Sequence, residues 1–147
     1  MRSRRLARAL GLGWVGLALL GASPGAAEPP GRDFAVRLEC QRRPTPGRVL
    51  CEAELEVERG VLVWADVLVL EAPSFAPPLR ARVGPSALFM KTDQRQRLQL
   101  ALAATEAGRG TLAIRARAVR CPDAGGRDCE PVTREARAVV SVGPITD

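Results

Sequence analysis

The stretch VLCEAELEVE, residues 49–58, alternates apolar and acidic side chains with a period of two. Successive side chains of a β-strand point to opposite faces, so this alternation predicts a strand with one buried and one solvated face. The apolar set is Val49, Cys51, Ala53, Leu55 and Val57, and the acidic set is Glu52, Glu54, Glu56 and Glu58. Such a strand is typical of an antiparallel sheet that packs one face on a core.

The same period recurs on both sides of this stretch, in residues 33–40, 79–83, 111–121 and 134–142. Residues 61–70 are nearly all apolar and rich in valine, which favours a strand whose odd-numbered positions face the core. Residues 94–107 leave two interpretations: an alternating strand, which we favour, or a helix that Asp93 caps. Six or seven short strands between Gly/Pro turns predict an all-β, immunoglobulin-like antiparallel β-sandwich.

Residues 1–27 have the pattern of a cleaved secretory signal peptide. Four arginines precede a short apolar run, and small residues lead up to Ala27, before the first acidic residue at Glu28. The apolar run is shorter than the ~20 residues that span a bilayer. We therefore expect an exported protein, periplasmic or secreted, with a single domain over residues 28–147 and no transmembrane segment in the mature chain.

The charge of the chain depends strongly on that N-terminal segment. The whole sequence has a net charge of +6, but residues 28–147 hold 18 basic against 16 acidic side chains, a net charge of +2. A domain that binds nucleic acid needs a basic surface, which a nearly neutral domain supports poorly. We therefore expect no nucleic-acid partner.

Four cysteines remain after residue 27, and an even number in an exported chain predicts disulfides. Cys40 and Cys51 flank a Pro/Gly turn, and Cys121 and Cys129 flank a Gly-Gly turn. We predict these two local pairings, each closing a short loop and stabilising the fold by about 3 kcal/mol in the chain-entropy model.

The sequence contains no histidine and no tyrosine. Catalytic Ser-His-Asp triads, histidine general bases and histidine-containing zinc sites are therefore excluded. The cysteine spacings do not fit a zinc site either. We expect no metal, no cofactor and no enzymatic activity.

Residues 120–142 place Cys121 and Cys129 between two strands, with Pro122 and Pro131 after them. This segment resembles the periplasmic N-terminal domain of the thiol–disulfide transporter DsbD, an immunoglobulin-like domain with two redox cysteines in a hairpin. The resemblance implies that Cys121 and Cys129 form a disulfide-exchange pair.

The alternative is that this second disulfide is purely structural. Arg127 is the only basic residue between the two cysteines, and three acidic neighbours offset it: Asp123, Asp128 and Glu130. Reactive thiolates need an electropositive environment, so the charge pattern favours the structural interpretation.

A candidate interface lies on the even-numbered face of residues 61–70, made of Leu62, Trp64, Asp66, Leu68 and Leu70. An exposed apolar patch with a tryptophan is typical of a partner contact. The other interpretation is that a neighbouring segment covers this face and an arginine pairs with Asp66, because an ionised carboxylate resists burial alone.

A candidate anion-binding set consists of arginines that share strand faces: Arg80, Arg82, Arg115 and Arg117. Aligned guanidinium groups bind carboxylates, sulfates and phosphates. The alternative places them opposite the acidic ladder of residues 52–58 as cross-strand ion pairs.

These features together predict an exported, non-catalytic binding or accessory module with a protein partner or a second copy of itself. The alternative function is periplasmic thiol–disulfide exchange through Cys121 and Cys129.

Overall fold

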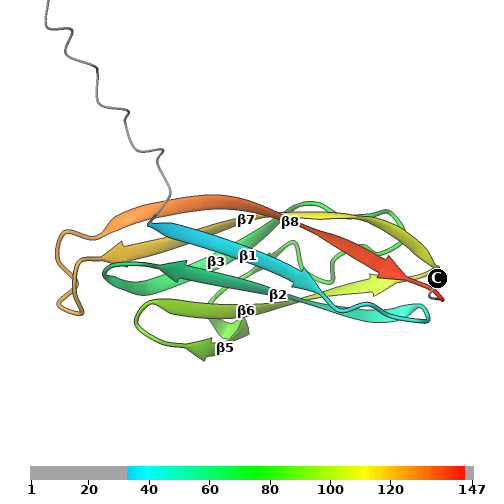
Figure 1. The fold of residues 1–147 in the computed structure, drawn as a ribbon, viewed down its shortest axis with the longest axis horizontal. Coiled ribbons are helices and arrows are strands. Elements are labelled where there is room, and N and C mark those ends of the chain that lie inside the picture. The colour runs from blue at the N-terminus through cyan, green and yellow to red at the C-terminus, as the bar shows by residue number, and fades with distance from the viewer. Residues whose placement is uncertain (1–32, 145–147) are drawn as a thin grey trace, which may run out of the picture.

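The computed structural model describes residues 33–144. The predicted signal peptide, residues 1–27, lies outside the described residues. Over residues 33–144 the chain is all-β, with two antiparallel sheets of four strands each (Figure 1). The predicted immunoglobulin-like β-sandwich is confirmed.

The first sheet has the order β1-β2-β6-β5 and the second the order β4-β3-β7-β8. The first comprises β1 (Phe34–Cys40), β2 (Gly47–Val57), β6 (Arg95–Ala104) and β5 (Leu88–Lys91). The second comprises β4 (Arg82–Val83), β3 (Val61–Glu71), β7 (Gly108–Cys121) and β8 (Glu130–Val142). In immunoglobulin terms these are A-B-E-D and C-F-G, with β4 as an added strand beside C. Eight strands replace the predicted six or seven. The strand predicted over residues 79–83 is reduced to β4, and β5 is an added strand too short to show a period.

Residues 95–104, for which the sequence left strand and helix open, form strand β6. β6 pairs with β2 along its whole length and with β5 at its beginning. Leu98, Leu100 and Leu102 are buried, as alternation requires. The favoured strand is confirmed and the helix capped by Asp93 is wrong.

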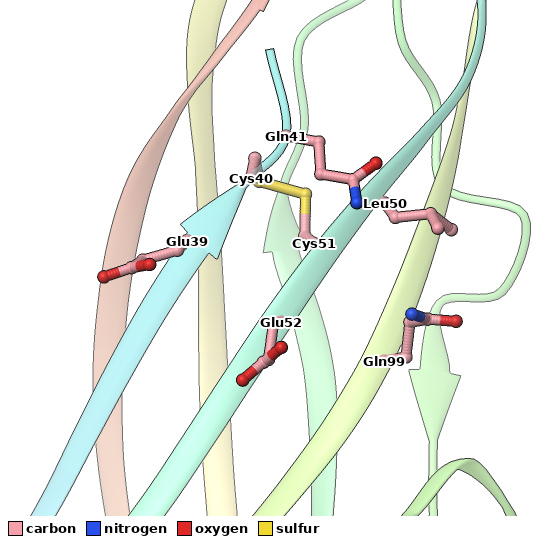
Figure 2. A pocket seen from close by; sticks show the side chains of 7 residues that line it. All are labelled: Glu39, Cys40, Gln41, Leu50, Cys51, Glu52 and Gln99. Carbon is pink, nitrogen blue, oxygen red and sulfur yellow. A yellow bond between two sulfur atoms is a disulfide. The ribbon is translucent and has the colours of Figure 1, made fainter. Parts of the chain in front are cut away.

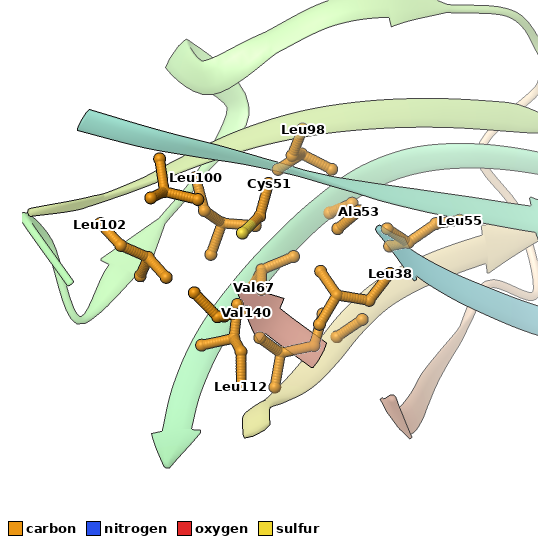
Figure 3. Close-up of a cluster of buried hydrophobic side chains, with 14 of the residues drawn as sticks. Leu38, Cys51, Ala53, Leu55, Val67, Leu98, Leu100, Leu102, Leu112 and Val140 are labelled. Atoms are coloured by element: carbon orange, nitrogen blue, oxygen red, sulfur yellow. The ribbon is translucent and has the colours of Figure 1, made fainter. Parts of the chain in front are cut away.

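The core lies between the two sheets and is almost entirely aliphatic. Figure 3 shows leucines of β6 and apolar residues of β2 facing Val67, Leu112 and Val140 of the other sheet. The acidic positions of β2 point away from this layer. Hydrophobic burial between the sheets is therefore the main force that holds the sandwich together.

Both predicted disulfides are present. Cys40 and Cys51 are direct cross-strand partners of β1 and β2, with 4.0 Å between their Cα atoms. Cys121 and Cys129 close the β7–β8 hairpin at 4.1 Å. Disulfides of this kind are typical of proteins that fold in an oxidising compartment. Within residues 33–144, no helix has the length and apolar character needed to cross a membrane.

Strand β3 departs from the predicted period at its start. A β-bulge between Leu62 and Trp64 shifts the register against β7, so that Val63 is 42 % exposed and Leu62 is fully buried. The Leu62 amide donates to the Asp93 carbonyl, and its carbonyl accepts from the buried Gln96 side chain at 2.9 Å. The predictions that Val63 faces the core and that Leu62 lies on the outer face are therefore wrong, since one extra residue inverts the alternation.

Candidate functional site

The outer face of the second sheet gathers most of the side chains that the sequence singled out. Trp64, Asp66 and Leu68 of β3 stand opposite Val119, Arg117 and Arg115 of β7, respectively, and Arg82 of β4 stands on the other side of Leu68. We call this surface the Trp64 face and define it as Trp64, Leu68, Arg82, Arg115 and Arg117. Leu70 follows at a second irregularity of β3 and is 44 % exposed.

Asp66 is fully buried although it belongs to the outer face of its sheet. Arg117 donates to it from Nε at 2.8 Å and through a second hydrogen bond from a terminal nitrogen. Arg82 donates from Nε at 2.6 Å. The carboxylate thus sits beneath two guanidinium groups whose other atoms reach solvent. This pairing belongs to the alternative interpretation of the face, in which an arginine neutralises Asp66.

The protonation of this cluster follows from its contacts. Burial alone raises the pKa of Asp66, but the hydrogen bonds and charges of Arg117 and Arg82 outweigh that effect and leave the pKa below its ordinary value. The hydrogen bond with Asp66 in turn raises the pKa of Arg117. The cluster is therefore fully ionised at neutral pH, with two positive charges around one negative charge.

Trp64 and Arg117 form a stacked pair on this face. The guanidinium carbon of Arg117 lies 5.9 Å from the centre of the Trp64 ring, within the range of a cation–π contact. Because Asp66 fixes Arg117 from below, the guanidinium group is held in place over the Trp64 ring. Tryptophan and arginine are the residues that most often dominate binding energy at protein interfaces.

The predicted anion-binding arginines do not act as one set. Arg82 and Arg117 are engaged by Asp66, and Arg115 pairs with Glu135 of β8 at 2.8 Å. Arg80 lies apart from them and has no ion pair within the described residues. Three of the four arginines thus contact a carboxylate of this chain, and Arg82 and Arg117 share one, which weakens their attraction for an external anion.

The acidic ladder of β2, the alternative partner predicted for the arginines of β4 and β7, forms ion pairs with other arginines. Its carboxylates lie on the other sheet and pair with arginines of the flanking strands. Arg97 contacts Glu54 at 2.6 Å, and Arg95 contacts Glu56 at 3.2 Å. The cross-strand ion pairs exist, but the predicted partners were wrong because the two ladders belong to different sheets.

The Cys121–Cys129 disulfide has two unlike halves. Cys121 is fully buried, whereas Cys129 lies in the exposed hairpin loop. Beside Cys121 is a cavity of about 280 Å³, bordered by Arg59 and Arg120 and by three acidic residues, Asp33, Asp128 and Glu130. Arg120 is paired with Glu130 and lies 3.5 Å from Asp33, so acidic side chains offset its charge near the disulfide.

A second cavity, of about 190 Å³, lies beside the Cys40–Cys51 disulfide. Figure 2 shows the bond joining the two neighbouring strands, with Glu39 and Glu52 on one side and Gln41 and Leu50 on the other. Over residues 33–144, no three side chains of the metal-binding types gather in a metal site.

One exposed residue beside the Trp64 face was not predictable from the sequence. Val63 becomes exposed beside Trp64 only because of the β-bulge, and no glycine or proline marks that position.

No protein-family model and no curated protein matches this chain. Among solved structures it is similar to the ASH / PapD-like domain of human CEP192 (PapD-like domain 7), with 10 % identity and a TM-score of 0.47 over 89 % of this chain and 98 % of that one.

Proposed function

We propose that the protein is an exported, non-catalytic binding module that presents the Trp64 face to a protein partner. One observation carries the proposal: a buried carboxylate, Asp66, holds Arg117 against Trp64 on the outer surface of a sheet. An arginine fixed in this way loses little conformational freedom when a partner docks.

The surroundings of the pair support a protein partner. Val63 and Leu70 expose apolar surface from the same strand, and Leu68 lies half-buried between charged neighbours. An apolar centre with a charged margin is the usual composition of a protein interface. The lack of histidine anywhere in the sequence speaks against acid–base catalysis at neutral pH.

Site-specific photocrosslinking in the producing cell tests this proposal. A photoreactive phenylalanine analogue replaces Leu68 on the Trp64 face, and in a matched control replaces Ala35 on the outer face of the first sheet. We expect a discrete crosslinked species from position 68 only, and we expect it to disappear when Trp64→Glu is added. The same species from both positions, or none from position 68, contradicts the proposal.

Thiol–disulfide exchange is the second candidate, and the exposure of Cys129 favours it. An external thiolate would attack Sγ of Cys129, form a mixed disulfide there and release Cys121 as the thiolate. Burial of Cys121 opposes this step because a buried thiolate loses its hydration.

A redox titration separates the two candidates. A Cys121–Cys129 reduction potential below about −300 mV indicates a structural bond, and one near −200 mV or above indicates exchange. We expect the low potential. The Cys40–Cys51 bond, measured in the same titration, serves as the internal reference.

A further inference from the structure

A third cavity lies between the first sheet and the segment that contains β4, and the path of the chain creates it. β6 is paired with β5 at residues 96–98 and with residues 77–79 at residues 101–103. Between these two pairings the chain leaves the first sheet, forms β4 on the second sheet and returns through the short 3₁₀ turn Pro85–Ala87. The detour spans the edge of β6 at Gln99, which has no strand partner on that side among residues 33–144.

The resulting space has a volume of about 310 Å³, and we call it the arch cavity. Its apolar lining comes from Leu79, Val83, Ala87 and Ala101, and its polar lining from Arg48, Arg80 and Gln99. The volume is at the small end of ligand sites, and an apolar lining with a few polar groups is typical of such sites.

The charge of the arch cavity distinguishes it from two other cavities that contain arginines. The cavity beside Cys121 and the one over the acidic ladder each contain carboxylates that offset their arginines. The arch cavity is lined by two arginines and no acidic residue, and within residues 33–144 neither Arg48 nor Arg80 has an ion pair. The nearest carboxylate by strand register is Glu52, opposite Gln99, and Arg97 engages it at 3.2 Å.

We propose that the arch cavity binds a small organic carboxylate with a short apolar tail. The guanidinium groups of Arg48 and Arg80 match a carboxylate in charge and in hydrogen-bond geometry. The Gln99 amide offers a further donor, while Leu79 and Val83 bury the tail. The acid is either a free small molecule or the terminal carboxylate of a peptide, since both present the same chemistry.

The binding experiment uses the oxidised, disulfide-bonded protein and follows its backbone amides by NMR. The probes are hexanoate, its uncharged analogue hexanamide, N-acetyl-leucine as a model of a chain end, and inorganic phosphate. We expect saturable shifts of the Gln99 and Ala101 amides with a carboxylate probe, no saturation with hexanamide, and weaker binding in 0.5 M salt. Preference for hexanoate identifies a free acid as the source, and preference for N-acetyl-leucine identifies a chain end.

Variants connect the binding to the two arginines. Arg48→Gln and Arg80→Gln should each weaken carboxylate binding about tenfold, the effect of losing one charged hydrogen bond. Arg109→Gln is the matched control, because Arg109 is also exposed and without an ion pair among the described residues but lies on β7. All three substitutions are at exposed positions, so the variants should fold normally.

Several results would overturn the proposal. One is that no carboxylate probe shifts the Gln99 and Ala101 amides at millimolar concentration. Another is that phosphate or hexanamide binds as well as the carboxylates. A third is that Arg109→Gln weakens binding as much as the cavity variants do. The arch cavity and the Trp64 face share no residue. The Trp64→Glu variant should therefore bind the carboxylate normally, and a failure of the carboxylate proposal does not contradict the proposed protein-binding function.

Discussion

Replacing Asp66 by asparagine tests whether the buried carboxylate organises the Trp64 face. The substitution keeps the size of the side chain but removes its charge and turns one acceptor oxygen into a donor facing Arg82 or Arg117. Breaking a wholly buried ion pair costs about 3–5 kcal/mol, whereas an exposed pair contributes about 0–1 kcal/mol. Asp66 is fully buried but its arginine side chains are 58 % and 40 % exposed and can rehydrate.

We therefore expect an intermediate loss of about 2 kcal/mol in the free energy of unfolding. For a domain of this size that corresponds to a fall in Tm of roughly 8 °C. Trp64 is the only tryptophan outside residues 1–27, so its fluorescence reports both on unfolding and on the site. Far-UV circular dichroism of the same samples checks that the two signals coincide, as two-state unfolding requires.

Glu135→Gln is the matched control because it makes the same chemical change on the same sheet face. Glu135 pairs with Arg115, and both side chains are about half exposed, so its loss should cost less than about 1 kcal/mol. Equal losses for the two variants would refute the reasoning that burial makes the Asp66 cluster important.

Acid pH gives a second check on the same variant. The folded protein holds the pKa of Asp66 below its ordinary value of 3.8. A carboxylate with a lowered pKa stabilises the fold above its unfolded pKa, and this contribution is lost as the pH falls through the folded pKa. The stability gap between the wild type and Asp66→Asn should thus hold at neutral pH and shrink below about pH 4. A gap that stays constant into strong acid would show that the charge of Asp66 is not its cause.

Three further sets of substitutions test the fold by denaturant unfolding. Gly60→Ala should lower the free energy of unfolding by at least about 2 kcal/mol, because the new Cβ would lie 2.3 Å from the Cys121 carbonyl oxygen. Gly47→Ala, also at positive φ but in open space, should lower it less. Leu62→Ala should cost about 2–5 kcal/mol and Leu70→Ala under about 1 kcal/mol, and the reverse order would contradict the bulge in β3. Replacing both cysteines of either disulfide by serine should cost about 3 kcal/mol, and an unchanged unfolding midpoint would argue against a structural role for that bond.

The sequence by itself determined the class of fold and both disulfides. Period-two alternation depends only on neighbouring residues, so it is visible wherever a strand is regular, as in residues 49–58. The disulfides were predictable because their cysteines are only 11 and 8 residues apart and flank turns. Local chemistry was sufficient for these features.

The tertiary structure alone decided which side chains meet. Asp66 is 16 residues from Arg82 and 51 from Arg117, and only the pairing of β3 with β4 and β7 brings them together. The bulge that buries Leu62 arises from the register in which β3 pairs with β7. The alternation of side chains within residues 61–70 does not reveal that register. Arg48 belongs to the arch cavity only because the chain crosses between the sheets and returns. Contacts between residues distant in sequence depend on register and topology, and a one-residue shift moves a side chain to the other face of its sheet.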